Sequence, residues 1–144
     1  MNCFSAAPKG TSYTYMIPGN PVPLMRPRYH HSGRIWDAQA LLKEKAAEII
    51  KLQHRNQPLL SGALHMEIVF YMPIPKGYSI KKKERIRGKP HTYRPDFSNM
   101  LKLVEDVCQD IVYKEDCIIS SLCGSKVYSE MPRTEVTFSE IIYE

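Results

Sequence analysis

The stretch RPDFSNMLKLVEDVCQDIVYKED, residues 94–116, is the part of the chain that most clearly indicates a fold. Its apolar residues follow the spacing i, i+3, i+4, i+7 and i+11, typical of the buried face of a helix, at Met100, Leu103, Val104, Val107 and Ile111. The pattern therefore predicts a helix from Asp96 to Ile111. The opposite face of this helix is polar and carries Asn99, Lys102 and Asp106.

Strands and a second helix are predicted on both sides of this stretch. β-Branched, aromatic and alternating apolar residues predict strands at 13–17, 63–72, 118–128 and 134–143. Asp37 is the expected N-cap of a helix that runs to about Arg55, and Gly124 is expected to form a bulge or bend in its strand. The proline-rich segments 18–35 and 73–95 are predicted to be long loops, the second with a short helical turn near residues 80–86.

Together these elements predict one α+β domain. A small mixed sheet of about four strands carries two main helices in the order β-α-β-α-β-β across residues 13–144, and residues 1–12 are expected to form a flexible leader. No apolar run approaches the roughly 20 residues of a membrane span, and the N-terminus lacks the features of a secretory signal. Four cysteines without C-x-x-C spacing favour reduced thiols and a cytoplasmic protein.

Charge is unevenly distributed along the chain, whose net charge is +5. Residues 1–35 contain four Lys or Arg and no acid, and residues 76–94 contain eight Lys or Arg against Glu84 alone. Several acids instead cluster at residues 105–116. Carboxylates inside a basic surface suit a metal-dependent enzyme whose substrate is a polyanion, because the metal takes oxygen ligands and the polyanion needs neutralising charge.

The polar residues also have plain structural explanations. Asp96 follows a proline at a helix start, where it is well placed to cap the helix. Lys102 and Asp106 are four residues apart, so a surface ion pair between them is expected. Glu115 and Asp116 fit a polar turn.

Phosphodiester hydrolysis is the chemistry that these residues would serve. Asp96 and Asp116 are the expected Mg²⁺ ligands, Lys102 would balance charge on the phosphate or assist the attacking water, and Asn99 would hold a carboxylate or a metal-bound water. To share one metal ion, Asp116 must come back to Asp96. A helix from Asp96 to Ile111 spans roughly 22 Å, whereas the chain from Ile111 to Asp116 reaches at most about 17 Å. We therefore expect the helix to end early, near residues 108–109, before a reversing segment. Otherwise a partner subunit must donate one acid.

The order of these residues resembles the RusA family of Holliday junction resolvases. The family pattern runs basic-Pro-Asp-x-Asp-Asn-x-x-Lys-x-x-x-Asp and is followed by an acidic pair. Residues 94–106 read RPDFSNMLKLVED, and Glu115 and Asp116 form the pair. The flanks agree as well, with IPGNPVP at 17–23, RPR at 26–28, MPIPK at 72–76 and Lys126.

The resemblance implies a homodimeric, Mg²⁺-dependent endonuclease, with Mn²⁺ as an alternative ion. Such an enzyme binds branched DNA, nicks two strands of a four-way junction in recombination and repair, acts in the cytoplasm without a membrane, and is often encoded by a phage or prophage. Carried onto this chain, the catalytic residues are Asp96, Lys102 and Asp116, the metal ligands are Asp96, Asp116 and Glu115, and the supporting residues are Ser98, Asn99 and Asp106. Contacts to DNA phosphates are expected from Arg26, Arg28, Arg34, Lys81, Lys82, Lys83, Arg85, Arg87, Arg94 and Lys126.

One position departs from the family pattern. The second aspartate of the Asp-x-Asp pair is Ser98 here, and a hydroxyl is a weaker, uncharged ligand. Metal affinity should fall, although Glu115 is a candidate to compensate. The alternative function is therefore a junction-binding or nucleic-acid-binding protein with weak or lost cleavage. A third is a small interaction protein whose basic loops contact RNA or another protein.

Overall fold

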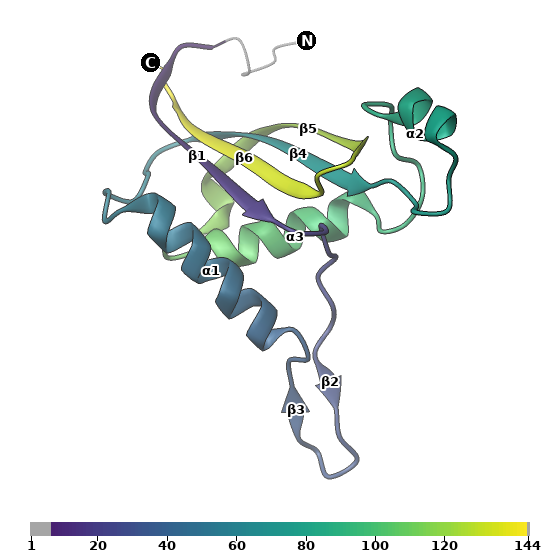
Figure 1. Ribbon diagram of the computed structural model, residues 1–144. Coiled ribbons are helices and arrows are strands. Elements are labelled where there is room, and N and C mark those ends of the chain that lie inside the picture. The colour runs from purple at the N-terminus through teal and green to yellow at the C-terminus, as the bar shows by residue number, and fades with distance from the viewer. Residues whose placement is uncertain (1–6, 144) are drawn as a thin grey trace.

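A four-stranded mixed sheet with two helices against one face forms the body of the protein (Figure 1). The structure is a computed structural model and describes residues 7–143. Its elements are β1 (Lys9–Pro18), β2 (Arg28–Tyr29), β3 (Ile35–Trp36), α1 (Ala40–His54), β4 (Leu64–Pro73), α2 (Ile80–Ile86), α3 (Phe97–Cys108), the 3-10 turn η2 (Asp116–Ile118), β5 (Ile119–Ser129) and β6 (Arg133–Ile141). The predicted α+β fold and the order of its main elements are confirmed.

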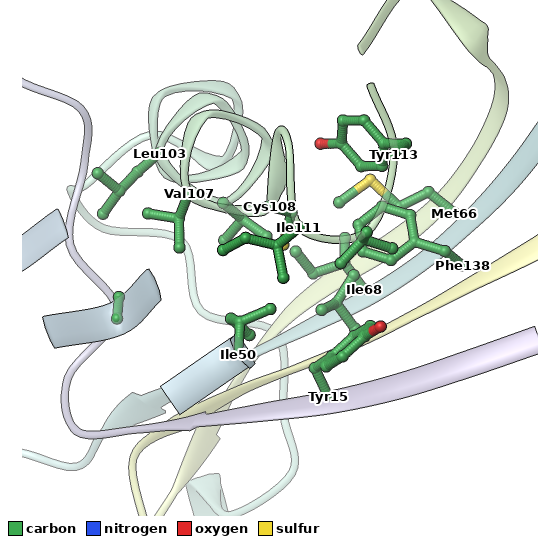
Figure 2. Packing of buried hydrophobic residues seen from close by; sticks show 14 of the residues in the cluster. Tyr15, Ile50, Met66, Ile68, Leu103, Val107, Cys108, Ile111, Tyr113 and Phe138 are labelled. Atoms are coloured by element: carbon green, nitrogen blue, oxygen red, sulfur yellow. The ribbon is translucent and has the colours of Figure 1, made fainter. Parts of the chain in front are cut away.

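The sheet has the strand order β1-β6-β4-β5. Strand β4 pairs in parallel with β5 and antiparallel with β6, and β1 pairs antiparallel with β6. Alternate side chains of β4, from Leu64 to Met72, face the helices and are at most 3% exposed. Figure 2 shows Met66 and Ile68 in one cluster with Val107 of α3 and Ile50 of α1. The core therefore lies between this central strand and the two helices.

Helix α3 has the predicted amphipathic pattern and the predicted early end. Its buried residues are Met100, Leu103, Val104, Val107 and Cys108. The helix stops at Cys108, and Asp110 has a left-handed φ of 68° that reverses the chain. Ile111 and Val112 then enter the core beside the helix, where the Val112 carbonyl accepts a 2.7 Å hydrogen bond from Leu60 N–H. The reversal sends the chain back along α3, as the length argument requires.

The N-terminal third differs from the sequence prediction in three places. Strand β1 begins at Lys9, so residues 9–12 of the expected leader pair with β6, while residues 1–6 lie outside the described part. The expected loop 18–35 contains β2 and the start of β3, which form a two-stranded sheet. Helix α1 begins at Ala40, because Asp37 instead accepts hydrogen bonds from Gln39 N–H at 2.9 Å and from Lys43 Nζ at 2.8 Å. The first two differences depend on pairing between segments, which local propensity does not reveal, and the third depends on the local side-chain contacts of Asp37.

Gly124 does not form the expected bulge, since its pairing with Ile68 continues the regular register of β4 and β5. A Cβ at this position would come closer than 3.0 Å to Cζ of Phe97. Glycine is therefore required because the first residue of α3 crosses the strand at close range. This contact fixes the N-terminal end of α3 against β5.

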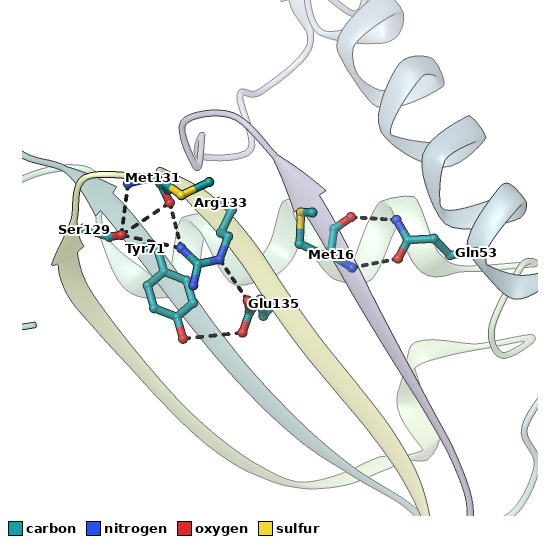
Figure 3. A network of polar contacts seen from close by, with 7 residues as sticks. All are labelled: Met16, Gln53, Tyr71, Ser129, Met131, Arg133 and Glu135. Atoms are coloured by element: carbon teal, nitrogen blue, oxygen red, sulfur yellow. Dashed lines mark hydrogen bonds and ion pairs between the residues drawn. The ribbon is translucent and has the colours of Figure 1, made fainter.

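Polar contacts complete both the edge and the outer face of the sheet (Figure 3). The Gln53 amide of α1 accepts from Met16 N–H at 2.8 Å and donates to Met16 O at 2.7 Å, which satisfies the free edge of β1. On the outer face, the Arg133 guanidinium lies 3.7 Å from the ring centroid of Tyr71 and donates to Glu135 at 2.8 Å.

Among the described residues, no helix has the length and apolar character needed to cross a membrane.

Candidate functional site

The polar residues of α3 lie on two separate stripes. Ser98, Lys102 and Glu105 follow the spacing i, i+4 and i+7, so they share one face of the helix. Asn99 and Asp106 lie on the neighbouring face, and Asp106 is directed to α1, where it forms an ion pair with Lys43 at 3.2 Å rather than with Lys102. The backbone carbonyl of Asn99 accepts a 2.9 Å hydrogen bond from Leu24 N–H.

Asp116 returns beside the first of these stripes, near Glu105. Burial raises the pKa of the Glu105 carboxyl, the Asp116 carboxylate raises it further, and Lys102 lowers it in part. Two acids and one lysine from two segments of chain are thus close enough to influence each other.

Tyr113 holds the returning segment against α3. Its ring is fully buried, and its hydroxyl donates a 2.8 Å hydrogen bond to the Glu105 carbonyl. Asp116 follows three residues later at the start of η2. The buried ring therefore anchors the chain just before Asp116, at the turn of α3 that carries Glu105.

Asp96 lies at the opposite end of the helix. It occupies the N-cap position but makes no side-chain capping hydrogen bond, so the expected capping role is not observed. Nine residues separate it from Glu105, which is about 13 Å along the helix axis. Glu115 is exposed and accepts only a weak 3.6 Å contact from the Cys117 thiol. Within residues 7–143, no group of three or more His, Cys, Asp or Glu side chains is arranged to hold a metal ion, so Asp96, Glu115 and Asp116 are not brought together as such a group.

The basic residues named from the sequence differ in their surroundings. Lys126 donates to the carbonyls of Tyr93 at 2.6 Å and Pro95 at 2.9 Å, so most of its hydrogen-bonding capacity supports the segment that leads into α3. Arg87 is paired with Glu130, and Lys82 lies 3.7 Å from the ring centroid of Tyr78. The other side chains of this set are exposed, apart from the partly buried Lys83: Arg26, Arg28, Arg34, Lys81, Arg85 and Arg94.

Glu105 is a candidate site residue that the sequence analysis does not name. The sequence places it only within an acidic cluster, while the neighbouring Asp106 matches the family pattern. The signal was present in the spacing, since Glu105 lies seven residues after Ser98 and three after Lys102. Which of the two adjacent acids faces Asp116 depends on how α3 is rotated against α1, and the Lys43–Asp106 ion pair reports that rotation.

Comparison with known proteins bears on this arrangement. A family model described as Endodeoxyribonuclease RusA matches residues 18–139, a range that contains the whole of α3, Asp116 and β5. An uncharacterized Bacillus subtilis (strain 168) protein, YqaN, is 30% identical over 139 residues, covering 88% of this chain and 95% of that protein. The family match spans well over half of the chain and agrees with the resemblance carried by residues 94–116. The chain therefore belongs to the RusA endodeoxyribonuclease family.

Proposed function

We propose that this protein cleaves branched DNA by metal-dependent phosphodiester hydrolysis, with Glu105 and Asp116 as its principal acidic pair. The observation that carries the proposal is the return of the chain to α3, where the Tyr113 hydroxyl donates to the Glu105 carbonyl three residues before Asp116. Asp116 and Lys102 are family motif positions, whereas Glu105 is not. In this proposal Glu105 supplies the negative charge that Ser98 lacks.

The donor set is chemically suited to Mg²⁺ or Mn²⁺. Two carboxylates are hard oxygen donors, and Mg²⁺ is commonly held by one or two carboxylates together with water and substrate phosphate. Burial is the main cause of the raised Glu105 pKa, and the added repulsion from Asp116 is of the kind that a divalent cation relieves. When bound, the ion would activate water and stabilise negative charge on the phosphate.

The other residues of the stripe have roles that follow from their positions. Lys102 lies between Ser98 and Glu105, where its ammonium would bind the phosphate beside the acidic pair. Ser98 would donate a hydrogen bond to a phosphate oxygen, which an aspartate there would repel. Asp96 is separated from Glu105 by about 13 Å of helix, so we assign it a role at the far end of the bound strand.

Cleavage of a synthetic four-way junction in Mg²⁺ tests this proposal. Glu105→Gln and Asp116→Asn are expected to abolish nicking and to abolish Mn²⁺ uptake measured by calorimetry. Asp110→Asn is the matched control, because it removes an acid just beyond the end of the same helix whose partner is Lys114 at 3.0 Å. Equal losses in Glu105→Gln and Asp110→Asn, or full activity in Glu105→Gln, would rule out the acidic pair.

Paired nicks in a symmetric junction require two active sites, so we propose that the protein acts as a homodimer. The basic residues named from the sequence would neutralise phosphates, and binding should weaken steeply with salt. Light scattering of the protein with and without junction DNA tests the dimer. A monomer on the junction would contradict paired cleavage by one assembly.

A second candidate is a junction-binding protein that has lost cleavage, and Ser98 is the observation that favours it. In that case the wild type binds junctions in EDTA and in Mg²⁺ without nicking them. Ser98→Asp restores the family carboxylate and is expected to restore cleavage. Efficient nicking by the wild type would exclude this candidate.

A further inference from the structure

We propose that the β2–β3 hairpin is a probe for the branch point, in which Tyr29 and Trp36 stack on bases that a junction leaves uncovered. This inference rests on the proposed action on branched DNA and assigns one element the choice between branched and linear substrates. The hairpin extends away from the sheet and both main helices (Figure 1). All four residues of its two strands are exposed.

Aromatic side chains lie on both faces of this hairpin. Arg28 pairs with Trp36 across the two strands and Tyr29 pairs with Ile35, so the two pairs project to opposite faces. Tyr29 is 77% exposed, Ile35 60% and Trp36 45%. The Arg28 guanidinium lies 5.7 Å from the Trp36 ring centroid, which holds the indole without burying it. Aromatic and aliphatic side chains exposed together in this way are a candidate interaction surface.

The base of the hairpin is fixed against the start of α1 and the first turn of α3. The Gln39 side chain accepts from Met25 N–H at 2.7 Å and donates to the Pro23 carbonyl at 2.8 Å. Leu24 N–H donates to the Asn99 carbonyl in the first turn of α3. From Leu24 to the turn at His31 the chain reaches at most about 24 Å. The tip can therefore contact DNA up to about 24 Å from a strand lying on α3, which is less than one turn of B-DNA.

Charge identifies the partner as nucleic acid rather than a second copy of the chain. The hairpin region contains Arg26, Arg28 and Arg34, and no Asp or Glu occurs before Asp37. A second copy also carries a net charge of +5, so packing the hairpin on it would bring like charges together. DNA offers the opposite charge to the arginines and flat ring faces to the aromatics.

Stacking explains how such a hairpin would recognise a branch. In linear duplex DNA the faces of the bases are covered by their neighbours, so an exposed aromatic residue finds no free face. At a junction the base pairs that flank the crossover lose a neighbour. An aromatic side chain can then take the vacant position, while the arginines contact phosphates on either substrate.

Trp36 provides a direct test because it is the only tryptophan in the chain. Its emission would be recorded in EDTA while the protein is titrated with a four-way junction that carries 2-aminopurine beside the crossover. A linear duplex of the same sequence serves as the comparison. We expect both Trp36 and 2-aminopurine to be quenched by complex formation with the junction only.

Variants separate stacking from charge. Tyr29→Ala and Trp36→Ala are each expected to weaken junction binding about 10-fold and leave duplex binding unchanged. Tyr143→Ala, which truncates an aromatic residue of 68% exposure near the other end of the described chain, is the matched control and should bind both substrates normally. Arg34→Gln should weaken both substrates equally, because phosphates occur in both.

Each outcome has a distinct meaning. If the wild type prefers junctions and both aromatic variants keep that preference, the hairpin inference is wrong and the proposed function stands. If the wild type shows no preference for junctions, the proposed action on branched DNA fails. If Trp36 emission changes with protein concentration in the absence of DNA and does not change when the junction is added, a second copy covers the hairpin. That result would overturn the inference.

Discussion

Replacing Gly124 with alanine is expected to lower the free energy of unfolding by about 1–3 kcal/mol, because the added methyl group has no room. A Cβ there would lie closer than 3.0 Å to Cζ of Phe97, 3.1 Å from Cγ2 of Ile68 and 3.3 Å from the Ile68 carbonyl oxygen. The Phe97 ring stands edge-on to Phe70 with centroids 5.1 Å apart, so it cannot move without disturbing the core. The strain should appear at the start of α3, beside Asp96 and Ser98.

The sign of this effect distinguishes two explanations of the glycine. Gly124 is not among the residues with positive φ in the described chain. If the glycine only allowed a bend, alanine would stabilise the protein by about 0.4–1 kcal/mol by restricting the unfolded chain. If close packing requires it, the midpoint of thermal unfolding should fall by roughly 3–10 °C.

Urea unfolding followed by circular dichroism measures the change. Gly77→Ala is the matched control, since a Cβ at Gly77 meets nothing within 4 Å, and its effect should stay within about 0.5 kcal/mol. Shortening the ring with Phe97→Leu should relieve part of the strain, so the double variant should deviate from additivity by about 0.5–3 kcal/mol. Additive effects, or a Gly124→Ala protein as stable as Gly77→Ala, would refute the packing argument.

Three further substitutions test charges and hydrogen bonds in and around the site. Burial and then the Asp116 charge raise the Glu105 pKa, so the stability contributed by this group is present below its ordinary pKa of 4.5 and is lost as pH rises through the raised pKa. Glu105→Gln should therefore unfold at a higher temperature than wild type in EDTA at neutral pH. An unchanged unfolding midpoint would contradict this unfavourable burial and repulsion. The hydrogen bond from Lys43, followed by that from Gln39 N–H, lowers the Asp37 pKa. The stability contributed by Asp37 is therefore present above pH 3.8 and is lost as pH falls through the lowered pKa. Asp37→Asn should be less stable than wild type at neutral pH, and thermal melts at a series of pH values should show this difference vanishing in acid. Lys126→Met removes the two hydrogen bonds to the Tyr93 and Pro95 carbonyls and should lower the free energy of unfolding in urea by about 1–2 kcal/mol. A stability equal to that of wild type would mean that Lys126 does not support the 93–95 segment.

The fold class follows from the sequence because its signals are local. Residues 97–108 keep the helical period, and the four long strands show enough alternation or β-branched content to be found to within a few residues at most ends. The early end of α3 agrees with the expectation from the sequence, but that expectation assumed a return of Asp116 to Asp96, whereas Asp116 comes back near Glu105. The motif at residues 94–116 was specific enough to indicate the family before any contact was known.

The candidate site depended on contacts between distant segments. Glu105 and Asp106 are neighbours with similar chemistry, and only the packing of α3 on α1 directs one to Asp116 and the other to Lys43. The hairpin was hidden for the same reason, because two strands of two residues each carry too little pattern to detect. The role of Gly124 was decided by the side chain of Phe97, which is 27 residues away in the chain.

The sequence by itself determined the elements, their order, the family and the charge that makes DNA the expected partner, because periodicity, motif spacing and composition are properties of the chain alone. Only the tertiary structure decided which acid faces Asp116, what surrounds Lys126 and Gly124, and that two aromatic side chains stand uncovered on an arginine-rich hairpin. The physical reason is that side-chain direction and burial depend on helix rotation and strand pairing, which are settled when separate segments pack together.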